Sequence, residues 1–387
     1  MKKSWMLWLV LVLVAAFTFV AVAGCEVEDE EPAENDNNND AAVADEEYDL
    51  DIATTWPSGI LLHEMAEMWA EYAEEMSGGR LNIEVHPSGA IVSAMEVLDA
   101  TQAGTIDGFH GWSGYWMGDH GAQNFFASTP MAMETDAHII WMYDRGLEYQ
   151  EEVYAEMGYD VKPFLCGATH PEMGAHSNVP LEELEDWVGT TYRVPGWMAQ
   201  ILEDMGVSVA VMEGGDVYPA LETGEIDAGE FSSPVVNHEL GFHEVTDYFT
   251  GPGIHQPTCM FELVLSQEVW EDLPPDLQAI VENATYKATN EAWTEDVVGG
   301  YDVVTSWMED HGNEPLYVSD EAQLEFREHA WDFISEEVEE EGPLAEEIWE
   351  DQLQFYLEFI EYDNFMTPHR QIPEDYQLPE EDQLRVD

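Results

Sequence analysis

The stretch YDLDIATTWPSGILLHEMAEMWAEYAEEMSGGRLNIEV, residues 48–85, predicts that the chain folds as an α/β protein. Residues 48–55 alternate between apolar and polar side chains, as a β-strand does. Ser58 can cap a following helix whose apolar side chains fall on one face, and Gly78 can end it. Residues 81–85 then alternate as a second strand. A strand, a helix and a strand in succession indicate α/β construction.

The same alternation continues further along the chain. A helix over about 91–103 leads to a short strand at 106–109, so the fold begins as βαβαβ. QAGTIDGF (102–109) is then echoed by ETGEIDAG (222–229), each at the end of a helix-like segment. Repetition this short can also arise by chance. Two similar α/β lobes with a cleft between them would explain it, and about 340 folded residues is generous for one domain.

The remaining segments complete the predicted domain organisation. Residues 48–165 form mainly the first lobe, and residues 166–260 mainly the second. Residues 261–365 supply a strand that crosses between the lobes and a helical C-terminal part, in which Pro275 can open a long helix. Residues 366–387 are polar and contain proline, so we expect a loose tail.

The charge balance excludes whole classes of partner. The 387 residues contain 83 acidic and only 10 basic side chains, for a formal charge of −73. Such a chain repels nucleic acid and anionic lipid. Hydrophobic residues still make up 45% of the chain, which is enough for a large core, so the acidity belongs to the surface of a folded protein. Our hypothesis is a halophile's surface, because high salt screens such self-repulsion.

The N-terminal segment predicts export. Residues 1–25 have a basic start, an apolar run and small residues before Cys25, which resembles a bacterial lipoprotein signal with lipidation of that cysteine. The alternative is an uncleaved anchor helix. Residues 26–47 are acidic and lack apolar periodicity, which predicts a disordered tether. Of the downstream cysteines, Cys166 and Cys259 are too few for a disulfide framework and are either bridged or two buried free thiols.

Six segments of the chain occur in an order that is found in a known family. They are GGRLNIEVHPSGAIVSAMEVLDATQAGTIDG (78–108), CGATHPEMGAHS (166–177), YRVPGW (192–197), GGDVYPALETGEIDAGEF (214–231), LGFHEV (240–245) and LPPDLQAIVENA (273–284). The order resembles the periplasmic solute-binding proteins of TRAP (tripartite ATP-independent periplasmic) transporters, in the subgroup that handles keto and hydroxy acids. The resemblance implies a two-lobed Venus-flytrap binding protein without catalysis, which passes its ligand to a membrane permease. Homodimers through a long C-terminal helix occur in this subgroup, and the sequence leaves that open.

The resemblance assigns the substrate carboxylate to Arg193. An arginine in the family motif that resembles YRVPG clamps this group, and Arg193 is the matching residue. A guanidinium suits the role because it offers two parallel N–H donors and stays charged when buried. The alternative is a surface arginine paired with some of the abundant acids. A small monocarboxylate, a 2-keto or 2-hydroxy acid, is the favoured ligand.

The resemblance also implies a bound metal ion. In the family the ion is held by a glutamine, by a glutamate with the next backbone carbonyl, and by a later glutamate; the matching positions are Glu172, Glu230, Phe231 and Glu262. Here Glu172 replaces the glutamine and Phe231 replaces a tryptophan. The added charge favours Ca²⁺ over Na⁺. Alternatively, Glu172 is protonated or binds an amine, or the two acids belong to the solvated surface.

Aromatic side chains near strand ends are candidates for the walls of the cleft. Trp56 and Trp197 follow strand ends in the two lobes, where open α/β sheets bind ligands. His255 resembles a position near the ligand in the family. The predicted substrate-binding set is therefore Arg193, Glu172, Trp56, Trp197, Glu230 and His255, and weaker wall candidates are His110, Trp112, Tyr115, Trp116 and Tyr218.

Two other classes of function, a metal-dependent enzyme and a sensory protein, fit the sequence less well. The run His170 to His176 contains metal-binding residue types, but it lacks the H-E-x-x-H spacing and Pro171 would break the helix that this motif requires. We therefore expect no enzyme. A sensory ligand-binding lipoprotein is the second alternative, but no transmembrane or signalling region follows the lobes.

Overall fold

The computed structural model describes residues 46–212 and 214–368. The predicted signal segment, nearly all of the predicted tether and the tail from residue 369 onward lie outside the described residues. Within the described ranges, no helix has the length and apolar character that crossing a membrane requires.

The first sheet is built around the opening strand–helix–strand unit. It has five strands in the order β2-β1-β3-β10-β4, with β1 parallel to β2 and β3, and β10 antiparallel to β3 and β4. The strands are β1 (Tyr48–Thr54), β2 (Leu81–His86), β3 (Gly108–Gly111), β4 (Val161–Thr169) and β10 (Cys259–Ser266). The predicted βαβαβ start is confirmed, with α2 (Leu61–Ser77) and, after the 3-10 turn η1 (Ala94–Glu96), α3 (Val97–Gln102) as connections.

The predicted cap of α2 is wrong. The N-cap residue is Ile60, not Ser58, and it makes no side-chain cap. The backbone N–H of Leu61 donates instead to the carboxylate of Glu239, at 2.9 Å. A carboxylate near the first turn of a helix satisfies a free N–H and suits the positive end of the helix dipole. Glu239 ends α10 (Pro234–Glu239), which belongs to the other lobe, so the two lobes meet at this helix end.

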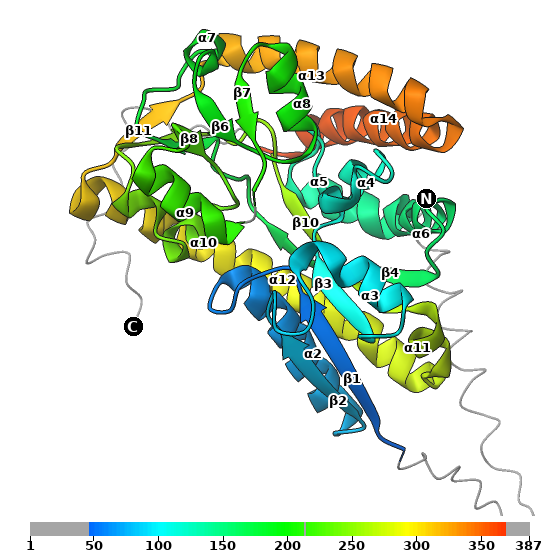
Figure 1. The fold of residues 1–387 in the computed structure, drawn as a ribbon. Helices are drawn as coiled ribbons and strands as arrows, with labels where there is room; N and C mark the ends of the chain where they lie inside the picture. The colour runs from blue at the N-terminus through cyan, green and yellow to red at the C-terminus, as the bar shows by residue number, and fades with distance from the viewer. Residues whose placement is uncertain (1–45, 213, 369–387) are drawn as a thin grey trace, which may run out of the picture. The chain divides into compact units, whose positions relative to one another are not determined.

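The second sheet forms the other lobe. It has six strands in the order β11-β9-β5-β8-β6-β7. They are β5 (Ala175–Ser177), β6 (Thr191–Arg193), β7 (Ser208–Ala210), β8 (Ala228–Gly229), β9 (Tyr248–Gly251) and β11 (Glu314–Tyr317). The accompanying helices are α7 (Leu184–Trp187), α8 (Gly196–Asp204), α9 (Gly214–Thr223), α10 and the 3-10 turn η4 (Phe242–Glu244). Figure 1 shows α7, α8, α9 and α10 near the labelled strands β6, β7 and β8.

Two chain segments cross between the sheets and touch each other. Residues 170–174 connect β4 to β5, and residues 252–258 connect β9 to β10. The backbone N–H of Glu172 donates to the carbonyl of Gln256, at 3.1 Å. A Cβ on Gly253 would lie 2.4 Å from the carbonyl oxygen of Glu172, so only glycine allows this approach.

Helices cover both sheets and join them. The long helix α12 (Pro275–Ser306) begins at the predicted proline and contacts α2 and β4 of the first lobe and α10 of the second. Near the C-terminus, α13 (Asp320–Glu341) and α14 (Pro343–Met366) pack against each other, and Figure 1 shows them side by side. The remaining elements are η2 (Ser113–Trp116), α4 (Gln123–Ala127), α5 (Thr135–Trp141), η3 (Met142–Gly146), α6 (Leu147–Glu156), α11 (Gln267–Asp272) and η5 (Trp307–His311).

The two cysteines of the folded part are not bridged. Cys166 and Cys259 are both free and buried, which decides between the two alternatives that the sequence left open. Burial in apolar surroundings raises the pKa of the Cys166 thiol, so it stays protonated and packs as a small apolar side chain.

Candidate functional site

Arg193 ends strand β6 and is only 1% exposed. Arg193 pairs with Gly229 of β8, so Glu230, which follows Gly229, lies beside the guanidinium of Arg193. Nη1 of Arg193 donates to Oε1 of Glu230 at 2.8 Å and to its backbone carbonyl at 2.7 Å. Nε and Nη2 donate to the carbonyl of Met212, at 3.2 and 2.9 Å. These bonds hold a buried cation in one orientation.

Two carboxylates and an imidazole meet beside this cation. Atoms of Glu172, Glu230 and His255 that could ligate a metal lie within 4.8 Å of one another, and all three side chains are buried. Nε2 of His255 is 3.5 Å from Oε2 of Glu172 and 3.4 Å from Oε2 of Glu230. Glu172 and His255 lie on the two crossing segments, whereas Glu230 follows β8. The cluster therefore joins three segments that are far apart in the sequence.

The buried charges of this cluster shift one another's pKa values. Burial raises the pKa of Glu172 to about 8, and the charge of Glu230 adds to this. Burial also opposes the ionised form of Glu230, but the charge of Arg193 outweighs it and lowers the pKa of Glu230. Burial lowers the pKa of His255, yet the nearby carboxylates of Glu172 and Glu230 outweigh that and raise the pKa to about 9. One carboxylate is thus ionised beside Arg193, and the other shares its surroundings with a protonated imidazole.

Gln256 is a member of the cluster that the sequence did not reveal. When its amide nitrogen faces Glu172, it donates to both oxygens of that carboxylate, 3.1 Å from Oε1. We assign this orientation to the amide because it places a donor, and not a second acceptor, against the Glu172 carboxylate. Gln256 directly follows His255, and this adjacency was the only signal in the sequence. The site therefore contains a glutamine amide. Gln256 supplies it, because position 172, which matches the glutamine of the family motif, holds a glutamate here.

The donor set of the cluster fits a hard cation. Among the described residues, Oε2 of Glu230 and both ring nitrogens of His255 are buried without a hydrogen bond of good geometry, and Nε2 of His255 has only its longer ion-pair contacts with Glu172 and Glu230. Buried polar atoms in that condition are rare in folded proteins and call for an explanation such as an ion. Two carboxylates and an amide offer oxygen ligands of the kind that Ca²⁺ and Na⁺ accept.

Aromatic side chains enclose a small cavity beside Arg193. The cavity measures about 20 Å³, which is room for roughly one water molecule. The guanidinium of Arg193 lies over the ring of Phe231, 5.5 Å from its centre. Nε1 of Trp56 donates to Nδ1 of His110 at 3.0 Å, which fixes the indole in the wall. The lining residues are Trp56, Leu62, Trp112, Tyr115, Glu172, Arg193, Pro195, Phe231, Ser232, Gln256, Cys259 and Phe261.

Other predicted site residues are not brought to this cavity. Trp197 packs against Phe125, with ring centres 4.9 Å apart, and lines a neighbouring cavity of about 10 Å³ together with His255. Tyr218 lies half-buried on α9 beside Gly241. His110 stands behind Trp56 rather than in the wall.

Glu262 also lies apart from the cluster. Its carboxylate accepts hydrogen bonds from Trp116 at 3.2 Å, from Gln150 at 2.7 Å and from Tyr154 at 2.8 Å. Phe261, its neighbour on β10, lines the cavity. The register of β10 shifts between Met260 and Glu262, and of the two neighbours only Phe261 lines the cavity, whereas the three partners hold the Glu262 carboxylate elsewhere.

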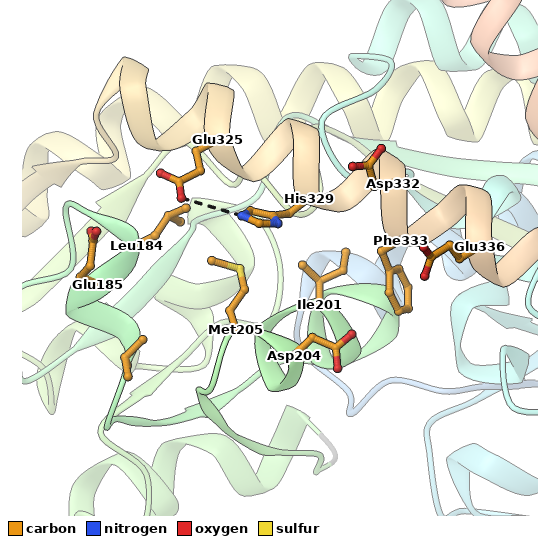
Figure 2. A pocket seen from close by; sticks show the side chains of 11 residues that line it. Leu184, Glu185, Ile201, Asp204, Met205, Glu325, His329, Asp332, Phe333 and Glu336 are labelled. Carbon is orange, nitrogen blue, oxygen red and sulfur yellow. Dashed lines mark ion pairs between the residues drawn. The ribbon is translucent and has the colours of Figure 1, made fainter.

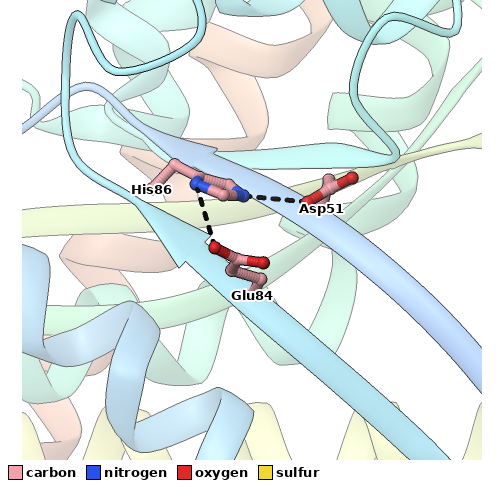
Figure 3. Close-up of side chains that lie close together, drawn as sticks. All are labelled: Asp51, Glu84 and His86. Atoms are coloured by element: carbon pink, nitrogen blue, oxygen red, sulfur yellow. Dashed lines mark hydrogen bonds and ion pairs between the residues drawn. The ribbon is translucent and has the colours of Figure 1, made fainter.

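Two other features of the surface fit a carboxylate ligand less well. A cavity of about 440 Å³ between α7, α8 and α13 has acids such as Glu325 and Asp332 at its edge and no lysine or arginine in its lining (Figure 2). Asp51, Glu84 and His86 form a second possible metal-ligand group on β1 and β2 (Figure 3). Its two acids are exposed, and Nε2 of His86 is already 2.8 Å from Asp51.

The chain was also compared with known proteins. The family described as bacterial extracellular solute-binding protein, family 7, matches residues 52–340. The monocarboxylate 2-oxoacid-binding periplasmic protein of Nostoc sp. is 32% identical over 238 residues, which cover 61% of this chain and 65% of that relative. The match thus spans just under two thirds of the relative's length.

Solved structures share the fold. A TRAP periplasmic solute-binding protein from Colwellia psychrerythraea with bound calcium and pyruvate has a TM-score of 0.78 and 24% identity, covering 83% of this chain and 98% of that one. One from Pseudoalteromonas atlantica with bound sodium and pyruvate also has a TM-score of 0.78, at 23% identity, covering 83% and 97%. These likenesses confirm the predicted two-lobed α/β fold.

Proposed function

The chain belongs to family 7 of the bacterial extracellular solute-binding proteins, and from this premise we propose that it captures a small monocarboxylate, a 2-oxo or 2-hydroxy acid, for a TRAP permease. Membership makes it a transport protein and not an enzyme. The Nostoc relative, whose name specifies monocarboxylate 2-oxoacids, supports this class of ligand.

The observation that carries the proposal is the buried guanidinium of Arg193. A chain with 83 acidic residues places one of its few cations, 1% exposed, at the wall of a cavity. A guanidinium offers five N–H donors. Four of those of Arg193 donate hydrogen bonds to Glu230 and Met212. One Nη2 donor remains, and Nη1 becomes available if Oε1 of Glu230 turns away. A ligand carboxylate would then receive the paired donors that it prefers.

A metal ion fits beside this clamp. We assign its protein ligands to Glu172, Glu230 and the backbone carbonyl of Phe231. Gln256 would offer its amide oxygen if the amide turned its nitrogen away from Glu172, and His255 is close enough to take part when neutral. When bound, the ion would neutralise the carboxylates and attract the ligand's 2-oxo or 2-hydroxy oxygen. A bound cation would favour ionised Glu172 and neutral His255, and in that state Glu172, Glu230 and the ligand carry three negative charges against the single positive charge of Arg193. A divalent ion balances this sum and a monovalent ion does not, so we favour Ca²⁺ over Na⁺.

The aromatic wall limits the size of the ligand. Trp56, Tyr115 and Phe231 surround a volume of about 20 Å³. A ligand larger than a water molecule therefore requires side chains or lobes to move, as binding proteins that close on their ligands do. A small acid such as pyruvate or lactate demands the least movement.

We further propose that the protein works outside the cytoplasmic membrane, anchored by a lipid on Cys25. The lipobox-like residues Val22 to Cys25 support this anchor. Its partner would be the membrane permease of the TRAP system. A homodimer remains a prediction; one structural neighbour, from Bordetella bronchiseptica, is described as a mixed occupancy dimer.

Tryptophan fluorescence tests the function directly. The chain has 14 tryptophans, and Trp56 and Trp112 line the cavity, so a bound ligand should change the emission. We expect saturable changes with pyruvate and lactate in the presence of Ca²⁺, and recovery of unaltered ligand afterwards. Malonate, with a second carboxylate, serves as the comparison. Chemical turnover of the ligand, or equal affinity for malonate, would contradict the proposal.

A further inference from the structure

Asp296 is a buried acid on the long helix α12, outside the cluster described above. Its side chain is 2% exposed, although the residues on either side, Glu295 and Val297, are exposed. Among the described residues, no lysine, arginine or histidine forms an ion pair with it. Burying a carboxylate without a cation is costly, so hydrogen bonds must compensate.

Those hydrogen bonds reach two segments that are distant in the sequence. Oδ2 of Asp296 accepts from the backbone N–H of His170 at 2.8 Å. Oδ1 accepts a short hydrogen bond from the hydroxyl of Ser233. His170 lies two residues before Glu172, and Ser233 lies three residues after Glu230. One carboxylate thus ties together the two segments that carry the acids of the candidate metal site.

The same face of α12 also holds the strand that leads into the first crossing segment. Thr289 lies seven residues before Asp296, which places both on one side of the helix. The backbone N–H of Gly167 donates to the Thr289 hydroxyl at 2.9 Å, and this hydroxyl donates to the carbonyl of Leu165 at 3.3 Å. The tied segments also bond directly, since Met173 N–H donates to the carbonyl of Ser232 at 3.3 Å.

We propose that Asp296 is a positioning residue of the binding site, which fixes the spacing of Glu172 and Glu230 through His170 and Ser233. Outer residues that orient metal ligands affect metal affinity strongly although they do not touch the ion. This inference rests on the proposed function, because it needs the two acids to hold an ion.

The test uses the full-length protein and three variants. Asp296→Asn removes the charge and turns one of the two acceptor oxygens into a donor, so that one of the two hydrogen bonds is either lost or reversed in direction. Ser233→Ala removes one partner, and it leaves α10 intact because the Ser233 side chain does not cap that helix. Glu295→Gln makes the same charge change one position away, on the exposed face, and is the matched control.

The measurements are the affinity for Ca²⁺ alone by calorimetry and the number of waters on bound Tb³⁺ by luminescence lifetimes. We expect Asp296→Asn to weaken Ca²⁺ binding about 10- to 100-fold and to admit additional water to Tb³⁺, with a smaller effect of the same kind for Ser233→Ala. Glu295→Gln should match the wild type. A merely structural role would lower the melting temperature without changing the affinity or hydration of the folded protein.

The outcomes separate this inference from the proposed function. If the wild type binds Ca²⁺ and both Asp296→Asn and Ser233→Ala bind it equally well, the positioning role is wrong and the function stands. If Asp296→Asn does not fold, Ser233→Ala alone decides by the same criteria. If the wild type binds neither Ca²⁺ nor pyruvate, the proposed function fails, and this inference fails with it.

Discussion

Nη1 of Arg193 lies 2.8 Å from Oε1 of Glu230, and both side chains are fully buried. The contact links the cation that we assign to the ligand with an acid that we assign to the metal. Glu230 therefore has two alternative partners. If Glu230 turned toward a metal ion held with Glu172, a donor of Arg193 would become available to the ligand, and we infer that metal and ligand would then bind cooperatively.

Replacing the clamp should abolish ligand binding. We expect Arg193→Ala to lower the affinity for pyruvate at least about 30-fold, because truncating one partner of a buried charge pair costs about 2–5 kcal/mol. Arg193→Lys keeps the charge but loses the paired donors, so its loss should be smaller. Arg145→Ala is the control, since Arg145 is 40% exposed and pairs with Asp144 and Asp351. Similar affinities for Arg193→Ala and Arg145→Ala would defeat the assignment.

The charge of Glu172 should select the metal. Glu172→Gln removes the carboxylate that a bound cation would keep ionised and leaves a side chain of the same shape. We expect Ca²⁺ affinity to fall about 10-fold or more and Na⁺ to support pyruvate binding better than in the wild type. Calorimetry with each ion after treatment with a chelator measures this. Unchanged preference between Ca²⁺ and Na⁺ would show that Glu172 does not hold the ion.

Acid should destabilise the first lobe through His110. Nε2 of His110 donates to the carbonyl of Cys166 and Nδ1 accepts from Trp56, so the ring is neutral in the folded state. Burial lowers its pKa from 6.5 to about 4. Below pH 6.5 the unfolded chain therefore binds a proton that the folded one does not. The free energy of unfolding should fall by about 1.4 kcal/mol per pH unit from this residue, down to pH 4.

The comparison of His110→Gln with the wild type isolates that contribution. Urea unfolding at pH 7 and pH 5 gives the pH-dependent loss for each protein, and the many surface acids cancel in the difference. Between pH 7 and pH 5, we expect the free energy of unfolding of the variant to fall by about 2 kcal/mol less than that of the wild type. Equal losses in both proteins would mean that the imidazole titrates normally.

Salt should stabilise the folded chain. The formal charge of −73 makes the surface repel itself, and raising the salt from 0.1 to 1 M shortens the Debye length from about 10 Å to about 3 Å. We expect the melting temperature to rise steadily over this range. Scanning calorimetry in NaCl and in KCl checks the result, and a melting temperature independent of salt would contradict a halophilic surface.

Local patterns predicted the secondary structure well because they depend on neighbouring residues. Strand β1, the helix α2 and the start of α12 all follow from apolar periodicity and from proline or glycine at the ends. The cap of α2 could not be predicted in this way. Glu239 lies 178 residues away in the sequence, and only the meeting of the lobes brings it to Leu61.

The residues of the site also divide into those that the sequence could predict and those that depend on tertiary contacts. The resemblance named Arg193, Glu172, Glu230 and His255, and the structure places these four together. Glu262 was assigned to the same group, but the strand β10 is buried on both faces, so no alternation in its sequence shows which way each side chain points. Gln256 was missed because crossing segments have no periodicity to read. Their positions depend on tertiary contacts such as that between Glu172 and Gln256.

The central claim is that Arg193 and a metal held by Glu172 and Glu230 bind a small monocarboxylate together. Calorimetric titration of pyruvate into chelator-treated protein, with and without added Ca²⁺, tests it most directly. We predict one pyruvate per chain with Ca²⁺, at least about 10-fold weaker binding without it, and binding to Arg193→Ala that is weakened at least about 30-fold at either condition. Pyruvate binding that is the same with and without Ca²⁺ and survives in Arg193→Ala would contradict the claim.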